Sequence, residues 1–188
     1  MSNDASAPAR AAAGETLCAP VLVSRVETPF GYLYLASEAG RLIASAGPDP
    51  ARTAAMAWGA LHWPLAGIEP AGRQHRATHA QVAAYFAGKL RRFELELALD
   101  EDTLVARGWR AAAEIPYACT LTYGELALDA GAPGAARAMG RSMSLCPLPL
   151  FVPCHRVIGA GGKPCGNRDS WRKREQLLAF ERACVAIA

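Results

Sequence analysis

Alternating hydrophobic and polar residues near the start of the chain predict a small antiparallel sheet. Residues 21–26 are rich in valine and predict a first strand. Residues 31–36 and 41–46 are two further β-rich runs. They flank Ser-Glu-Ala-Gly at residues 37–40, a sequence typical of a hairpin turn. We therefore expect three antiparallel strands in one sheet.

A helix is predicted beside this sheet, because residues 77–90 carry apolar side chains at a helical spacing. One face of that helix would cover one face of the sheet. Residues 93–99 largely alternate between apolar and polar, which predicts a further strand or an extended link. Residues 47–73 give no clear pattern. The expected apolar face of the helix consists of Val82, Ala83, Phe86 and Leu90.

The second half of the chain favours helices over strands. Residues 104–114 predict a helix with Trp109 as its apolar anchor. Thr122 and Glu125 have the spacing of a capping box, with Thr122 at the N-cap, and they predict a short helix through Leu128. We therefore expect this half to be mostly helical.

A second short helix is predicted over residues 135–143, after a Gly-containing turn at residues 131–134. Helix, brief turn and helix are typical of a helix-turn-helix, although an αα-hairpin in an ordinary bundle has the same pattern. Arg137 and Arg141 are four residues apart and share one face of the second helix. Small residues would keep that helix slim enough to enter a groove, namely Ala135, Ala136, Ala138 and Gly140.

The length allows one domain or two small ones, and we expect an α+β protein with two. The chain has 188 residues, and no apolar run approaches the length of a membrane span. Residues 1–18 begin with an Ala/Ser/Pro-rich stretch, which predicts a disordered tail rather than a signal peptide. The acidic residues 100–102 mark the expected boundary between an N-terminal α/β domain at 19–100 and a C-terminal domain at 101–188.

The cysteines indicate a reducing compartment. There are six of them, with neither metal-ligand spacing nor a compact disulfide framework. We therefore expect free thiols in a cytoplasmic protein that holds no metal. A zinc site built from Cys18 with His62, His75 or His79 is possible in principle, but nothing in their spacing supports it.

The charge pattern favours a nucleic-acid partner more than the net charge of +3 does. Basic residues gather in the C-terminal half, which is what a phosphate-facing surface requires, although a merely solvated face would have the same composition. These basic residues are Arg137, Arg141, Arg156, Lys163, Arg168, Arg172, Lys173, Arg174 and Arg182.

Residues 148–157 carry the strongest candidate for chemistry. An apolar run bounded by prolines ends in Cys154, which His155 and Arg156 follow at once. Such a run suits a buried extended segment that fixes the backbone where the thiol occurs. A thiol beside cations ionises more easily, and the thiolate is the nucleophilic form. The alternative is that Cys154 is simply a small buried hydrophobe.

A glutamate in the last predicted helix, about residues 171–185, offers a partner for this histidine. Glu181 lies on the apolar stripe of that helix, where an unpaired carboxylate would be very costly to bury. If His155 is its partner, then Cys154, His155 and Glu181 form a relay in which the histidine takes the thiol proton, directly or through a water. The alternative is a partly exposed Glu181 paired with Arg174 or Arg182. The rest of the stripe consists of Leu177, Leu178, Cys184 and Val185.

Several motifs resemble the O6-alkylguanine-DNA alkyltransferases, also called methylated-DNA–protein-cysteine methyltransferases. The active-site motif matches Pro-Cys-His-Arg-Val at residues 153–157. The resemblance implies a small ribonuclease-H-like N-terminal sheet with a helix, followed by a helix-turn-helix (winged-helix-like) alkyltransferase domain. Further matching stretches occur in order at residues 115–117, 122–127, 136–140 and 147–149, with a weaker one at 85–89.

The resemblance also implies a role for each matching residue. Cys154 matches the acceptor thiol, His155 its base, and Glu181 the carboxylate that orients the histidine. Tyr123 matches the tyrosine that crowds the target phosphate, helps to rotate the nucleotide out, and can assist the leaving guanine. Arg137 matches the arginine that fills the vacated place in the base stack.

The implied activity is that of a methylated-DNA–[protein]-cysteine S-methyltransferase, which repairs DNA by direct reversal. Such a protein flips out an O6-alkylguanine, takes the alkyl group onto its cysteine irreversibly, and reacts once. We expect a monomer without cofactor that binds double-stranded DNA through the minor groove and associates with the nucleoid. The expected DNA-binding residues are Arg137, Tyr123, Ala135, Ala138 and Arg141, and the expected substrate-pocket residues are Trp109, Val152, Pro153, Asn167, Arg168 and Asp169.

The chain departs from the family pattern at two places. Cys146 stands where the family usually has an Asn that braces the turn before the active site, and a thiol cannot supply the same amide hydrogen bonds. After the nucleophile the family typically has Gly-Tyr-x-Gly-Gly, whereas residues 166–170 are Gly-Asn-Arg-Asp-Ser. Asp169 adds a negative charge that disfavours a nearby thiolate, and Arg168 would offset it.

Two alternative functions follow from these features. A degenerate alkyltransferase-like protein would bind alkylated DNA without efficient transfer; the loop changes favour it and the retained Cys154 disfavours it. A Cys-His hydrolase would use the same relay on an acyl substrate without any dependence on DNA, which the helix-turn-helix disfavours.

Overall fold

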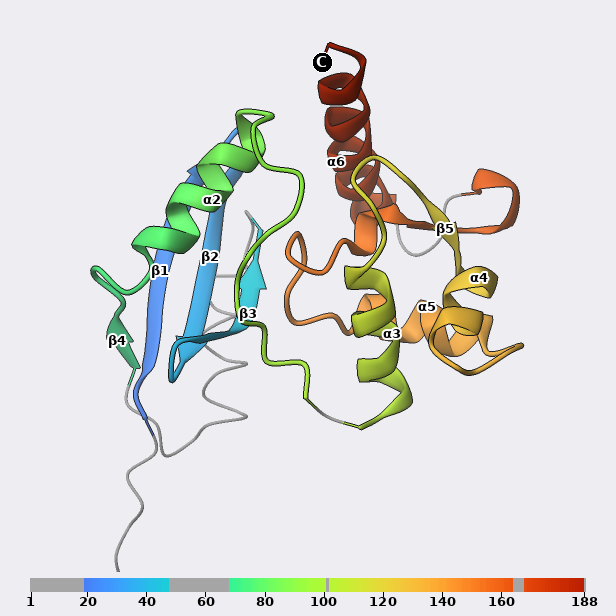
Figure 1. Cartoon of the computed structure of the whole chain (residues 1–188), viewed down its shortest axis with the longest axis horizontal. Helices are drawn as coiled ribbons and strands as arrows, with labels where there is room; N and C mark the ends of the chain where they lie inside the picture. The colour runs from blue at the N-terminus through green and yellow to red at the C-terminus, as the bar shows by residue number, and fades with distance from the viewer. Residues whose placement is uncertain (1–18, 48–67, 101, 164–167, 188) are drawn as a thin grey trace, which may run out of the picture.

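The chain is an α+β protein, as the sequence predicts: a small sheet carries one helix, and a mostly helical half follows (Figure 1). The structure is a computed structural model. The residues that it describes are 19–47, 68–100, 102–163 and 168–187, with 68 and 168–170 described by their backbone alone.

The sheet contains the three predicted antiparallel strands and one more. Its order is β3-β2-β1-β4, and β4 pairs in parallel with β1 at an edge. The β2–β3 connection turns at Ala39 and Gly40, which both have positive φ, as a tight two-residue hairpin turn requires. The strands are β1 (Val21–Thr28), β2 (Gly31–Glu38), β3 (Arg41–Ala46) and β4 (Ile68–Pro70).

The helix α2 (Arg76–Phe86) packs on the sheet, but its end and its buried face differ from the prediction. The helix stops at Phe86 instead of residue 90, because the chain turns at Gly88, which has a φ of +71°. Its buried residues are Thr78, Val82 and Tyr85, whereas Ala83 is exposed. The apolar stripe is therefore rotated so that Tyr85 points into the core.

The second half has the predicted helices, with small shifts at their ends. The capping box is confirmed, since the Thr122 side chain accepts from the Glu125 N–H and the Glu125 carboxylate accepts from the Thr122 N–H. A short parallel pair, β5 with β6, was not predicted. The elements are α3 (Leu104–Ala113), β5 (Leu121–Thr122), α4 (Tyr123–Asp129), α5 (Ala136–Ser144), β6 (Val157–Ile158), α6 (Arg168–Ala186), and two 3-10 turns, η1 (Cys154–Arg156) and η2 (Ala160–Gly162).

Helices α3 and α5 approach closely at Gly108. A Cβ atom at this position would lie 2.6 Å from the Ser142 hydroxyl oxygen and 3.0 Å from the Met139 sulfur. The same contact places the Ser142 hydroxyl 2.6 Å from the Val105 carbonyl, to which it donates, and the Trp109 indole N–H donates to the Ser142 carbonyl at 2.8 Å. Trp109 thus anchors α3, as predicted, and it does so through a hydrogen bond as well as by packing.

The two halves share one hydrophobic core. Leu35 and Val82 from the sheet half belong to the same cluster of buried side chains as Met139 and Val152 from the helical half. Residues 93–99 are the extended link rather than a full strand, because only Leu97 forms a ladder contact, an isolated parallel bridge to Leu42 of β3. Strand β3 is the edge of the sheet nearer to the helical half, and the link runs beside it (Figure 1).

Some predictions concern parts of the chain that the structure leaves out or treats only in part. The expected tail at residues 1–18 lies outside the described residues, and so do Cys18 and His62 of the possible zinc site. The two histidines of that site that are described, His75 and His79, both hydrogen-bond to Ser24. None of the described helices has the length and hydropathy that crossing a membrane requires.

Edge strand β3 holds the segment before the candidate nucleophile, which gives a stability test. Ser45 donates from its backbone N–H to the Pro147 carbonyl and from its hydroxyl to the Pro149 carbonyl, both at 2.8 Å. Ser45→Ala should lower the free energy of unfolding by about 1 kcal/mol, because a part-buried carbonyl loses its donor. Urea unfolding monitored by tryptophan fluorescence would measure the loss. Ser144→Ala, which removes an exposed hydroxyl, is the control and should change stability by less than about 0.5 kcal/mol.

Candidate active site

A tight turn presents Cys154 at the start of η1. The Val152 N–H donates to the Leu148 carbonyl at 2.8 Å, and the Cys154 N–H donates to the Val152 carbonyl at 2.7 Å. Leu150, between Leu148 and Val152, has a φ of +80°. This conformation costs free energy for a leucine and persists only when the surroundings enforce it. The packing of this turn on the core and its bonds to Ser45 provide that enforcement. The backbone around the thiol is therefore fixed, as the apolar run predicts.

The unpredicted strand pair brings a second candidate residue into the same region. Leu121 and Thr122 of β5 pair with Val157 and Ile158 of β6, which begins directly after η1. Tyr123 follows β5 at the first position of α4. The pairing of β5 with β6 thus brings two segments that are distant in sequence together next to Cys154.

Glu181 is completely buried, and its carboxylate accepts hydrogen bonds from three segments: η1, α2 and the turn at Ala118. His155 Nε2 lies 2.8 Å from Oε1, and the Arg156 guanidinium donates to both carboxylate oxygens. The Tyr85 hydroxyl donates to Oε1 at 2.7 Å, and the Ala118 N–H donates to Oε2 at 2.9 Å. The predicted contact between His155 and Glu181 is confirmed. The alternative of a partly exposed Glu181 is wrong, and the arginine that pairs with it is Arg156.

These contacts determine the protonation of the pair. Burial alone would raise the pKa of Glu181, but hydrogen bonds from His155 and Arg156 outweigh it and hold that pKa well below the ordinary value. Burial lowers the pKa of His155, although Glu181 opposes the shift. A neutral His155 next to an ionised carboxylate carries its proton on Nε2, which leaves Nδ1 as a proton acceptor.

Two residues of this cluster have roles that the sequence did not show. Arg156 was expected beside the thiol, but its guanidinium points to Glu181 and to the Ile115 carbonyl, at 2.6 Å from the latter. Tyr85 comes from α2, in the other half of the chain, and burial together with Glu181 raises the pKa of its hydroxyl. The family-like stretch at residues 85–89 was the one signal that pointed toward Tyr85.

The apolar stripe of α6 is shorter than predicted. Leu178 is buried, and Leu177 and Cys184 are partly buried, but Val185 is 45% exposed. Glu181 therefore lies in the part of α6 that packs against η1, and the apolar stripe ends about one helical turn later.

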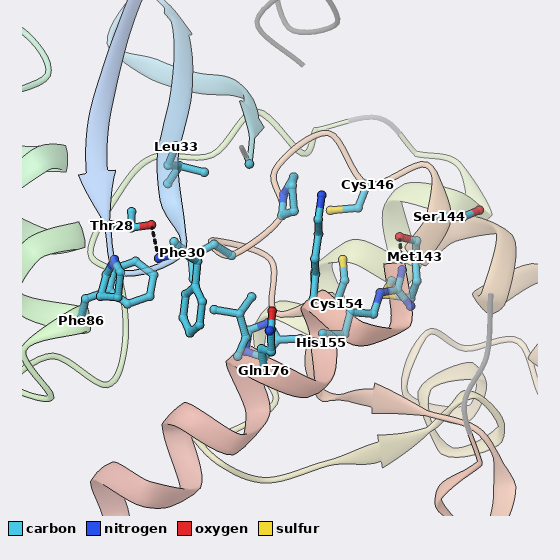
Figure 2. A pocket seen from close by; sticks show the side chains of 17 residues that line it. Thr28, Phe30, Leu33, Phe86, Met143, Ser144, Cys146, Cys154, His155 and Gln176 are labelled. Carbon is cyan, nitrogen blue, oxygen red and sulfur yellow. Dashed lines mark hydrogen bonds between the residues drawn. The ribbon is translucent and has the colours of Figure 1, made fainter. Parts of the chain in front are cut away.

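A cavity of about 610 Å³ opens beside the thiol. Cys154, His155, Cys146 and Arg174 line it, together with apolar residues of the β1–β2 turn such as Phe30 (Figure 2). Arg174 donates to the Tyr123 hydroxyl and to the Met143 carbonyl, both at 3.2 Å, so it connects α6 to the start of α4. No hydrogen bond joins Cys154 to His155 in the described part of the chain, so proton transfer between them requires a water or a small movement.

The predicted pocket residues are only partly described. Trp109 and Val152 are not in the lining of this cavity: Trp109 bonds Ser142, and Val152 is fully buried. Pro153 lines a different cavity, on the side of residues 91–97. Asn167 lies outside the described residues, as do the side chains of Arg168 and Asp169. The assignment of these six residues to a substrate pocket stays a prediction.

The predicted DNA-binding residues lie on α5 and at the start of α4. Arg137 and Arg141 are exposed, as their shared helical face requires. Ala135 and Ala138 are partly buried and pack against the core, so only part of each side chain could contact a DNA groove. Gly140 lies against Tyr123, because a Cβ atom added to this glycine would be 4.0 Å from the tyrosine ring. Among the described residues, no group of metal-ligating side chains could hold a metal ion.

Comparison with known proteins assigns this site to a family. The family profile described as "6-O-methylguanine DNA methyltransferase, DNA binding domain" matches residues 104–183. A methylated-DNA–protein-cysteine methyltransferase of Methanosarcina acetivorans is 43% identical over 109 residues, which are 58% of this chain and 70% of that protein. This chain belongs to the methylated-DNA–protein-cysteine methyltransferase family.

Other members of this methyltransferase family are similar over different lengths. The relative from Mycolicibacterium paratuberculosis is 49% identical over 102 residues, 54% of this chain, and the match spans 62% of that protein's length. A crystal structure of the Mycobacterium tuberculosis O6-methylguanine methyltransferase has a TM-score of 0.72 at 36% identity, covering 87% of this chain and 93% of that chain. A structure of Mycobacterium tuberculosis OGT in complex with DNA has the same TM-score and identity and covers 87% of this chain and 94% of that chain. The fold similarity therefore includes both halves.

The buried ion pair of this family member predicts a pH-dependent loss of stability. Glu181→Gln should lower the free energy of unfolding at neutral pH by about 3–5 kcal/mol, because Arg156 would keep a buried charge without its carboxylate. The pKa of Glu181 is depressed in the folded state, so its stabilisation is present at neutral pH and shrinks as the pH falls below about 4.3, the value in an unfolded chain. Urea unfolding from neutral to acid pH should therefore show the gap between wild type and variant narrowing.

The exposed Glu175 on the same helix provides the control for this experiment. Glu175→Gln should change stability by less than about 0.5 kcal/mol at neutral pH. A gap between wild type and Glu181→Gln that stayed constant into the acid range would contradict an ionised Glu181.

The hydrogen bond from the Tyr85 hydroxyl to Glu181 predicts a separate effect on stability, because Tyr85 lies in the other half of the chain. Tyr85→Phe should cost about 1–2 kcal/mol, since one donor to a buried carboxylate is lost while the ring still packs against Phe93. Thermal and urea unfolding would measure it. Tyr32→Phe, at an exposed position, should leave stability unchanged; equal losses in both variants would argue against the Tyr85–Glu181 bond.

Proposed function

We propose that this protein repairs alkylated DNA by moving an alkyl group from O6 of guanine to the sulfur of Cys154. The observation that carries the proposal is a thiol at the wall of a cavity, next to a histidine that a fully buried glutamate orients. Membership of the methyltransferase family supports the same chemistry. The enzyme class is methylated-DNA–[protein]-cysteine S-methyltransferase.

The transfer step uses the site as follows. Nδ1 of His155 accepts the thiol proton, either through a water or after a small rotation of a side chain. The Nε2–H of His155 remains hydrogen-bonded to Glu181 during this step. The Cys154 thiolate attacks the alkyl carbon in line, a C–S bond forms, and the C–O bond breaks with its electron pair moving into guanine. The Tyr123 hydroxyl can donate a proton toward the departing base. A thioether has no easy reverse route, so each molecule reacts once.

The DNA contacts follow from α4 and α5. An alkyl group on a stacked guanine cannot reach a nearly buried thiol, so the nucleotide has to leave the helix. We propose that α5 enters the minor groove with Arg137 filling the vacated place in the stack, and that Arg141 and the edges of Ala135 and Ala138 contact the DNA. The exposure of both arginines supports this placement. A solved relative in complex with DNA supports a DNA partner.

Coarser features of the molecule complete the proposal. We propose a ribonuclease-H-like N-terminal domain at residues 19–100 and a winged-helix-like C-terminal domain at 101–188. All the proposed site residues belong to one chain, so we propose a monomer. We also propose that it is cytoplasmic and nucleoid-associated, and that it needs no cofactor.

A second candidate is a protein that binds alkylated DNA without efficient transfer. The replacement of the tyrosine and both glycines in the loop at residues 166–170 favours it, because these residues shape the guanine pocket in the family. The retained Cys154, with its oriented histidine, favours transfer. A hydrolase with the same relay would not require the exposed arginines of α5.

The deciding measurement is the intact mass of the protein after incubation with a duplex oligonucleotide that carries one O6-methylguanine. Wild type should gain one methyl group per molecule, and peptide mapping should place it on Cys154. The matched control is Cys154→Ser, which should gain nothing. The same incubation with an unmodified duplex should leave the mass of wild type unchanged.

Each other outcome selects a different function. No gain in mass, but tighter binding to the methylated than to the plain duplex, would favour the non-transferring protein. Neither transfer nor preferential binding would contradict both DNA functions.

A further inference from the structure

A pair of thiols in the cavity has a chemistry that alkyl transfer does not use. Cys146 and Cys154 both line the cavity, and their sulfur atoms lie near each other (Figure 2). Neither cysteine is in a disulfide, so this is a neighbouring pair of free thiols.

The backbone holds this pair together. Cys146 follows α5 directly, and Cys154 opens η1, so the two flank the turn that contains Leu150. The turn is closed by the bond from the Val152 N–H to the Leu148 carbonyl and is attached to β3 through Ser45. The approach of the sulfurs therefore follows from the fold of the turn.

The surroundings make the two thiols chemically different. Burial, and then the contact with Cys154, raise the pKa of Cys146 well above the ordinary value, so this thiol keeps its proton at neutral pH. Arg174 lines the same cavity and places a positive charge near Cys146, which opposes only part of this rise in pKa. The cavity of about 610 Å³ is large enough to admit a molecule of the size of water or hydrogen peroxide.

We propose that Cys146 and Cys154 form an intramolecular disulfide when the protein meets hydrogen peroxide, and that this bond reversibly blocks the acceptor thiol. In the first step the Cys154 thiolate attacks one peroxide oxygen, the O–O bond breaks, and a sulfenic acid forms with release of hydroxide. Cys146 then loses its proton and attacks the Cys154 sulfur; the S–S bond forms, and the hydroxyl group leaves with the proton as water. Peroxide is reduced by two electrons, and the two sulfurs together lose two.

The disulfide has a protective consequence, which rests on the proposed function. A sulfenic acid without a neighbouring thiol proceeds to sulfinic acid, which cells reverse only rarely. A disulfide returns to two thiols on exchange with a dithiol reductant. Cys146 would therefore preserve a protein that can react only once, by keeping its acceptor sulfur recoverable during oxidative stress.

The test treats the reduced full-length protein with about three molar equivalents of hydrogen peroxide, because oxidation of one thiol to sulfinic acid consumes two. Free thiols are then alkylated and the peptides mapped by mass. Wild type should lose the mass of two hydrogen atoms and yield a linked peptide that joins Cys146 to Cys154. Its capacity for methyl transfer should fall at least about tenfold and return after a dithiol reductant. Cys146→Ser should instead accumulate Cys154 sulfinic acid, and reductant should not restore it.

Cys184 is a second partly buried cysteine and provides the matched control. Cys184→Ser should form the same linked peptide as wild type. Sulfinic acid at Cys154 in wild type, a link to any cysteine other than Cys146, or no reaction of Cys154 would each overturn the proposal. The mapping needs no DNA, so failure of the reduced protein to transfer a methyl group would contradict the proposed function and leave the disulfide result to stand alone.

Discussion

The buried carboxylate of Glu181 is the constraint on which the rest of this structure depends. An ion with no exposed surface persists only if every oxygen lone pair is used and a compensating charge lies beside it. Arg156 provides the charge, and His155, Tyr85 and the Ala118 N–H provide the remaining donors. These donors come from three separate segments of the chain: η1, α2 and the turn at Ala118. The contacts that orient His155 beside Cys154 are therefore the same contacts that stabilise the buried carboxylate in the folded protein.

This constraint explains why the sheet half belongs to the active site although it holds no reacting group. Helix α2 contributes Tyr85 to Glu181, and strand β3 contributes Ser45 to the turn before Cys154. The turn contains Leu150 in a left-handed conformation, which needs support from its surroundings. A helical half without the sheet would lose one donor to its buried carboxylate and two bonds to its catalytic turn. The shared core has the same consequence, because Val82 of the sheet half and Val152 of the helical half are buried in one cluster.

The sequence predicted the features that depend on local chemistry. The capping box at Thr122, the three strands and the contact between Glu181 and His155 are all confirmed, the last because a carboxylate on an apolar stripe must have a partner. Features that depend on tertiary distance were missed. Tyr85 and Arg156 find Glu181 only after α2 and η1 are packed, and β4 and β6 are too short for any periodicity to reveal them. The roles of the site residues in catalysis and DNA binding stay predictions.

The position of Cys146 shows how one residue can change the chemistry of a site. Cys146 comes two residues after the end of α5 and lines the same cavity as Cys154, so the side chain at this position lies beside the candidate nucleophile. An amide at this position would offer hydrogen bonds of fixed direction, whereas a thiol offers weaker ones. In exchange, a thiol can form a covalent bond with the neighbouring sulfur. The same residue therefore removes the amide hydrogen bonds that are expected in the family and provides the second thiol that the proposed disulfide requires.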